Sequence, residues 1–152
     1  MHGRITFWRD SAQLPLVEIA RPERPLDVVV PYTDPALTAR ALAAATELAR
    51  GFEAAVTLMA VYVVPFRAPL ECQDGIRKRL EADLTAVART IPVSVSVKLV
   101  FARSREEAYL RMLGRQSLVV IGARNRPWPT PETRLARRLT AGGHSVAVVK
   151  VR

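Results

Sequence analysis

The sequence lacks several features that would assign a function class directly. It has a single cysteine, Cys72, so no disulfide bond can form within the chain. No apolar run approaches the roughly 20 residues of a membrane-spanning helix, and the first ten residues contain no apolar segment of the kind that a signal peptide needs. We therefore expect a cytoplasmic domain that does not enter a membrane, because disulfide-free chains are typical of that compartment.

Residues for common catalytic and metal sites are also scarce. The chain has two histidines, His2 and His144, which form no metal-ligand set with one cysteine. There is no Ser-His-Asp spacing, no phosphate-binding GxxxxGKS or GxxxxGKT loop, and no GxGxxG motif. We expect no catalytic residues, no metal and no enzymatic activity, with a weak ATPase as the alternative. Cys72 lies in a predicted loop and is expected to be an inert thiol.

Acidic residues are depleted in only one part of the chain. Residues 1–102 carry 12 basic and 11 acidic side chains, whereas residues 103–152 carry 11 basic and 3 acidic ones. A basic surface attracts phosphates and other polyanions, so a polyanion-binding module in the C-terminal third is one hypothesis. No stacking aromatic residues are interleaved with Arg134, Arg137 and Arg138, however, and we therefore expect no nucleic-acid partner.

Strands and helices alternate regularly along the chain. Strands are predicted over 26–30, 55–64, 93–101, 117–122 and 145–151, and helices over 34–51, 74–90, 104–114 and 132–141. This alternation predicts an open parallel α/β sheet with right-handed crossovers and helices on both faces. The strand over 93–101 alternates between apolar and polar residues, which indicates a sheet edge. In the first helix, Leu37, Ala41, Ala44 and Leu48 are predicted to face inward.

Two other segments lie outside this pattern. Residues 1–25 are predicted to be an N-terminal extension to a main domain over 26–152. Apolar residues flank a polar centre in the extension, which predicts a hairpin or edge strands that pack on the domain or on a second subunit. Trp128 lies between two prolines, and we expect it to pack locally, with closure of a pocket or contact with a partner subunit as alternatives.

Three passages of the main domain resemble the universal stress protein family, of the adenine-nucleotide α-hydrolase-like class. They are LDVVVPYTD with the alanine-rich helix that follows it, VTLMAVYVVP, and LVVIGAR followed by a loop, a helix and HSVAVVKV. The resemblance covers residues 26–152 and implies a five-stranded parallel sheet in the order 3-2-1-4-5. It also implies a role in the stress response and a homodimer paired through the last strand, Val146 to Val151.

The phosphate-binding motif of the family is altered in this chain. Nucleotide-binding members carry Gly, two residues, Gly, nine residues, Gly, and then Ser or Thr. Gly122 matches the first glycine, Asn125 stands at the second, and Glu132-Thr133 stands at the last pair, in a loop that is three residues shorter. A carboxylate at a helix start competes with phosphate for the same amides, and prolines remove amide donors. We therefore expect a regulatory or binding domain with a degenerate nucleotide site and no cofactor.

The alternative is a protein that binds ATP or another adenine nucleotide. In that case Arg124 and Arg126 would replace the missing amides, because guanidinium groups offer forked donors to phosphate oxygens. The resemblance matches Val61 to a valine that contacts adenine, and Thr33 or Asp34 to an acidic residue after the first strand. The residues that would bind the nucleotide are Thr33, Asp34, Val61, Gly122, Arg124, Asn125, Arg126 and Thr133.

Overall fold

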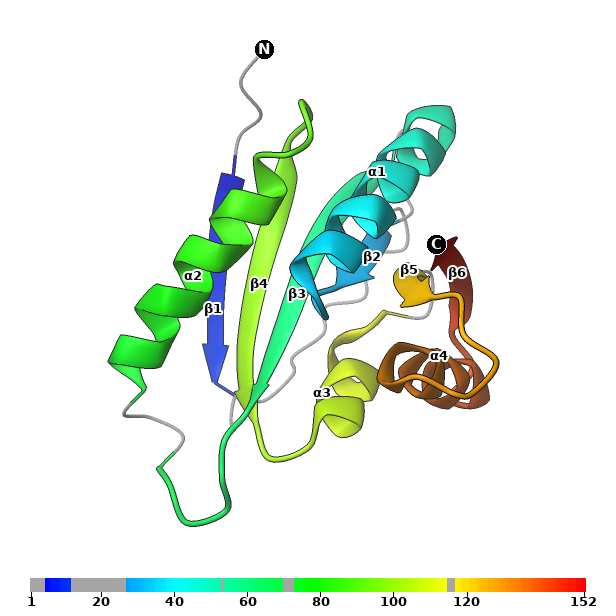
Figure 1. The fold of residues 1–152 in the computed structure, drawn as a ribbon. Helices are drawn as coiled ribbons and strands as arrows, with labels where there is room; N and C mark the ends of the chain where they lie inside the picture. Colours follow the sequence, from blue (N-terminus) through cyan, green and yellow to red (C-terminus); the bar gives the residue numbers. More distant parts are fainter. Residues whose placement is uncertain (1–4, 12–26, 53, 70–72, 115–116) are drawn as a thin grey trace.

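The computed structural model describes residues 5–11, 27–52, 54–69, 73–114 and 117–152. These residues form a six-stranded parallel sheet in the order β1-β4-β3-β2-β5-β6 (Figure 1). The strands are β1 (Ile5–Ser11), β2 (Asp27–Pro31), β3 (Ala55–Val63), β4 (Val95–Ala102), β5 (Ser117–Arg124) and β6 (Ser145–Val151). The helices are α1 (Pro35–Phe52), α2 (Asp74–Ala88), α3 (Arg105–Met112) and α4 (Pro131–Ala141).

The predicted strand order of the main domain is confirmed. Counted from β2 onward, the five strands lie in the order 3-2-1-4-5. The prediction that β4 is a sheet edge is wrong, because β1 pairs with β4 over the register Ile5–Val95 to Ser11–Phe101. On the face of β4 that carries its polar positions, Val100 and Ala102 belong to the core that α3 and α4 cover.

Some predictions for the N-terminal part and one loop fall on positions outside the described residues. These are residues 1–4 and 12–25 of the extension, and the loop position of Cys72. A hairpin in the extension and a domain boundary after residue 25 therefore stay predictions.

Helices cover both faces of the sheet. Figure 1 shows α1 and α2 on one face and α3 and α4 on the other. Alternate residues of each strand enter the two cores: Val28 and Val30 pack toward α1 and α2, whereas Val29 packs toward α3 and α4. Full burial of an aliphatic side chain such as Leu42 contributes about 1.5–3 kcal/mol. Within the described residues, no helix has the length and apolar character that a membrane span requires.

Helix α1 begins as the sequence predicts, but only part of its predicted inward face is buried. The carboxylate of Asp34 caps the helix, because its Oδ1 accepts hydrogen bonds from the amides of Ala36 (2.9 Å) and Leu37 (3.2 Å). The helix continues one residue past Gly51. Leu37 and Ala41 are buried as predicted, whereas Leu48 is 37% exposed, contrary to the prediction, and Leu42, Ala45 and Ala49 are buried in addition.

Candidate functional site

The candidate site lies where β2 and β5 separate. These neighbouring strands pair from Asp27–Ser117 to Val29–Val119, and β5 then continues to Arg124 paired with β6. The connections from β2 and β5 leave the sheet in opposite directions, which makes this the topological switch point. In open α/β sheets, ligands bind beyond the carboxyl ends of the strands at such a point.

Gly122 lies inside β5, although the sequence predicts that it ends the strand. A Cβ atom at this position would meet the backbone carbonyl oxygen of Leu37 at 2.3 Å and the carbonyl carbon at 2.9 Å. The first turn of α1 therefore packs directly on the backbone of β5, and only glycine permits this approach. On this face of the sheet, the space beside Gly122 is filled by α1.

Asp34 and Arg124 bind one another across the switch point. The Nη2 atom of Arg124 lies 3.5 Å from Oδ2 of Asp34, while Oδ1 of Asp34 caps α1. Both side chains are more than a third exposed, so the pair contributes at most about 1 kcal/mol to stability. Its importance is chemical, because the guanidinium that was predicted to hold phosphate already has an anionic partner.

The start of α4 has few amides to offer a phosphate group. Pro131 at the first helical position has no amide hydrogen. The amide of Thr133 donates to Oγ1 of Thr130 (3.3 Å), and the amide of Arg134 donates to the carbonyl of Thr130. Oγ1 of Thr133 accepts from the amide of Thr130 (2.8 Å) and closes the capping box. Among the first four helical residues, only the amide of Glu132 is left for a ligand.

The loop between β5 and α4 carries the other predicted phosphate ligands. The amide of Asn125 donates to the carbonyl of Val151 (3.1 Å) and ties the loop to β6. The guanidinium carbon of Arg126 lies 5.4 Å from the ring centroid of Trp128. Trp128 is 58% exposed, so the expected local burial of this ring is not observed.

Two predicted site residues, Val61 in β3 and Thr33 after β2, differ in what they can offer a ligand. Val61 is buried in the core that α3 and α4 cover. The amide of Thr33 donates to Oγ1 of Thr38 (3.1 Å). The Oγ1 atom of Thr33 is buried and has no hydrogen-bond partner in the described part of the chain. A ligand at the switch point could form a hydrogen bond with this hydroxyl group. Among the described residues, no other predicted site residue has a buried side-chain polar atom without a hydrogen-bond partner.

Two tyrosines that contact the middle of β3 are neutral groups. The hydroxyl of Tyr109 donates to the carbonyl of Met59 (3.1 Å), which also accepts from the amide of Tyr32 (2.7 Å). Burial raises the pKa of Tyr109 above its ordinary value. Burial also raises the pKa of Tyr32, and the nearby Asp83 and Asp34 add to this shift. Neither tyrosine is therefore a base at neutral pH.

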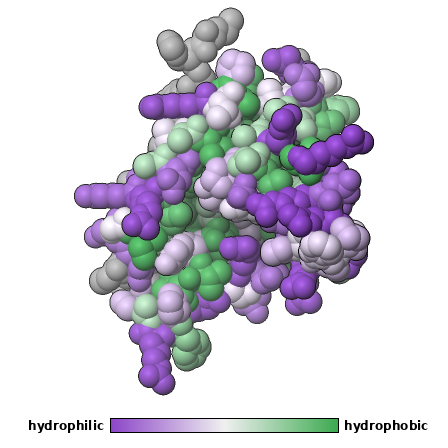
Figure 2. Space-filling view, viewed as in Figure 1, coloured by the Kyte–Doolittle hydropathy of each residue, from purple (hydrophilic) through white to green (hydrophobic). Residues whose placement is uncertain are grey.

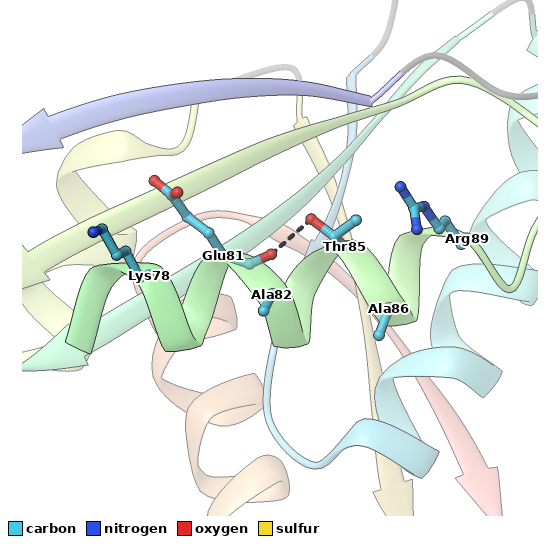
Figure 3. A pocket seen from close by; sticks show the side chains of 6 residues that line it. All are labelled: Lys78, Glu81, Ala82, Thr85, Ala86 and Arg89. Atoms are coloured by element: carbon cyan, nitrogen blue, oxygen red, sulfur yellow. Dashed lines mark hydrogen bonds between the residues drawn. The ribbon is translucent and has the colours of Figure 1, made fainter. Parts of the chain in front are cut away.

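Three pockets lie away from the switch point. The first runs along one face of α2 and is lined by Lys78, Glu81, Ala82, Thr85, Ala86 and Arg89 (Figure 3). The hydroxyl of Thr85 is used within the helix, because it donates to the carbonyl of Glu81 at 2.6 Å. The others lie between α4 and β6, with a volume of about 440 Å³, and between β4 and α3, with about 200 Å³. Thr133 lines the α4–β6 pocket, and no other predicted site residue lines any of the three.

The described residues offer no cluster of metal ligands. Nowhere in the described ranges do three or more His, Cys, Asp or Glu side chains gather in a way that would hold a metal ion. Thr130 shapes the candidate site and was not predicted from the sequence, because it caps the helix start that a phosphate would need. A threonine directly before Pro131 is a recognisable N-cap signal, and it could have been identified.

Solved structures with a similar architecture include universal stress proteins. One from Archaeoglobus fulgidus has a TM-score of 0.54 at 14% identity and covers 84% of this chain and 95% of its own. A family member from Burkholderia pseudomallei has a TM-score of 0.52 at 22% identity, covering 81% and 94%. A universal stress protein in complex with cAMP has a TM-score of 0.52 at 17% identity, covering 86% and 100%.

These likenesses show the fold. No protein-family model and no curated protein matches the chain. The chain thus has the universal stress protein fold, as the resemblance of its sequence implied.

Proposed function

We propose that this chain is a cytoplasmic regulatory or binding domain of the universal stress protein type that does not bind ATP in the manner of the nucleotide-binding family members. The observation that carries the proposal is the closed start of α4. Thr130 and Thr133 satisfy one another, and Pro131 provides no donor. A triphosphate needs several free amides at a helix start, together with a positive field. Here one amide is free, and it belongs to the acidic residue Glu132.

The electrostatics of the switch point support the same proposal. Arg124 is paired with Asp34, and Arg126 lies over Trp128. A phosphate would have to displace the Asp34 carboxylate from Arg124, or Trp128 from Arg126. Each displacement subtracts from the binding free energy, because only the surplus over such costs appears as affinity. The domain is therefore proposed to act through another ligand or through a protein partner, and not as an enzyme.

Thermal unfolding with millimolar ATP, AMP or cAMP tests this proposal. A ligand present at 100 times its Kd stabilises a protein by about 2.7 kcal/mol. For a domain of this size that corresponds to a rise in Tm of about 5–10 °C. We expect a change smaller than 1 °C with each nucleotide. A saturable rise of several degrees would overturn the proposal.

The alternative function is adenine-nucleotide binding with arginine assistance. It is favoured by the buried Oγ1 of Thr33, which has no partner among the described residues, and by the cAMP bound to a protein of the same fold. In this case nucleotide released by acid from the purified protein should absorb at 260 nm. The substitution Arg126→Glu should weaken nucleotide binding at least tenfold. The control Lys78→Glu, in α2 on the other face of the sheet from α4, should have little effect. Equal binding by both variants would remove the arginine-assisted version.

We also propose that the domain forms a homodimer through β6. This strand ends the sheet, and its apolar residues are only partly covered, with Val148 38% exposed. An unpaired strand edge is a template for pairing with another chain. In an antiparallel two-fold pair, Val148 at the centre of the strand would lie beside its own copy. That the N-terminal extension packs on the partner stays a prediction.

Light scattering during size-exclusion chromatography tests the dimer. The substitution Val148→Glu should produce monomers, because it places two like charges directly opposite one another. The matched control is Val63→Glu, since Val63 is 41% exposed at the end of β3 and lies away from β6. A dimer that survives Val148→Glu, or a wild-type monomer at micromolar concentration, would contradict this interface.

A further inference from the structure

The loop before α4 presents an aromatic ring to solvent beside a cation. Trp128 is 58% exposed even with the guanidinium of Arg126 placed 5.4 Å from its ring centroid. Pro127 and Pro129 flank the ring and stiffen the backbone on both sides. Tryptophan is enriched at interfaces because its large apolar ring carries a polar edge. Trp128 is therefore a candidate for contact with a partner.

The outer face of α4 continues this surface with positive charge. Leu135, Ala136 and Leu139 are buried, whereas Arg134, Arg137 and Arg138 are exposed. No acidic group within the described residues forms an ion pair with any of these three arginines. Glu132 is the only acidic residue between positions 117 and 152.

The loop that carries Trp128 leads directly into α4, which carries the three arginines. Figure 1 shows the loop after β5 curving around α4 on the side remote from α2. Hydrophilic side chains gather over that side in the space-filling view (Figure 2). A stacking ring thus precedes an un-neutralised row of arginines, an arrangement that the sequence pattern did not reveal because the ring lies ahead of the arginines and not between them.

We propose that the exposed ring and the arginines around it bind single-stranded nucleic acid. We name this set the Trp128 surface, and it consists of Arg126, Trp128, Arg134, Arg137 and Arg138. An unpaired base stacks on the indole ring, and the following phosphates contact the arginines of α4. Stacking on one aromatic ring requires a base that is free of its duplex, which favours a single strand over a double helix. Arg126 is also a predicted ligand of a nucleotide at the switch point, whereas Trp128 and the arginines of α4 are not, so the test uses Trp128, Arg137 and Arg138.

Fluorescence anisotropy of a labelled 12-nucleotide oligo(U) strand, titrated with the full chain at several salt concentrations, tests the proposal. For single strands, the slope of log K against log salt is about −0.7 for each phosphate neutralised. The double substitution Arg137→Gln/Arg138→Gln should therefore make the slope about 1.4 units less steep. Trp128→Ala should weaken binding about tenfold, which corresponds to the loss of one base stack.

The matched control is Lys78→Gln/Arg79→Gln. It removes the same charge from exposed residues of α2, on the other face of the sheet, and should leave the affinity within about twofold. The proposal is overturned if the strand does not bind at low salt, or if the control weakens binding as much as the α4 pair does. It is also overturned if Trp128→Ala has no effect. Equal affinity for a 12-residue polyglutamate peptide, unaffected by Trp128→Ala, would assign the surface to acidic proteins instead.

Discussion

Replacing Gly122 by alanine tests the packing that fills one side of the candidate site. The added methyl group would lie 2.3 Å from the carbonyl oxygen of Leu37, a backbone atom that cannot rotate away. Either the first turn of α1 moves away from β5, or β5 bends. Overpacking of this kind costs about 1–3 kcal/mol, and contact with backbone places the expected value near 3 kcal/mol. For a domain of this length, the corresponding fall in Tm is about 6–12 °C.

The assay is thermal and urea unfolding of Gly122→Ala. The control is the same substitution at a glycine that has space for a Cβ atom. Gly75 lies in α2, where an added Cβ atom would have no other atom within 4 Å, so Gly75→Ala should raise stability by about 0.5–1 kcal/mol. The two substitutions are chemically identical and should change the unfolding free energy in opposite directions. If Gly122→Ala unfolds within 1 °C of the wild type, α1 does not pack on β5 as described, and the space beside Gly122 is open to a ligand.

Three further predictions concern the groups around the site. Asp34→Ala should lower stability by about 1 kcal/mol through loss of the α1 cap, whereas Asp34→Asn should retain most of it, as measured by urea unfolding. Thr133→Val should cost about 1 kcal/mol and Thr133→Ser much less, because only the hydroxyl closes the α4 capping box, and Tm should fall by about 2–4 °C with valine. Tyr109 should stay neutral in the folded protein when pH is raised past 10, so its stabilising effect is complete below that pH and declines above it as the unfolded chain ionises. Absorbance at 295 nm should then show Tyr109 titrating only with unfolding, and Tyr109→Phe should remove that step.

Much of the fold could be predicted because local signals and tertiary packing agree. The helix start at Asp34-Pro35 and the strand over Ser145–Val151 lie where the sequence places them. The helix predicted from residue 104 begins after Ser104, whose side chain caps it by accepting a hydrogen bond from the amide of Glu107. Local patterns could not show that β1 pairs beside β4, because the choice between strand edges depends on contacts distant in sequence. The error for Leu48 has a similar origin. An alanine-rich helix is apolar on more than one side, and the way it packs on the sheet decides which of its residues are buried.

The candidate site was less predictable than the fold. Alignment to a motif placed Gly122 and Thr133 at phosphate positions, but their contacts are internal: one accommodates Leu37 and the other closes a cap with Thr130. The pairing of Arg124 with Asp34 joins residues far apart in sequence, and only the sheet order brings them together. The exposure of Trp128 also depends on how its loop leaves β5.

A crystal structure determined with ATP at millimolar concentration tests the central claim most directly. We expect that the hydrogen bonds between Thr130 and Thr133 persist, that Arg124 stays beside Asp34, and that no density for a nucleotide lies at the switch point. Density for a triphosphate held by main-chain nitrogens between residues 122 and 133 would contradict the claim.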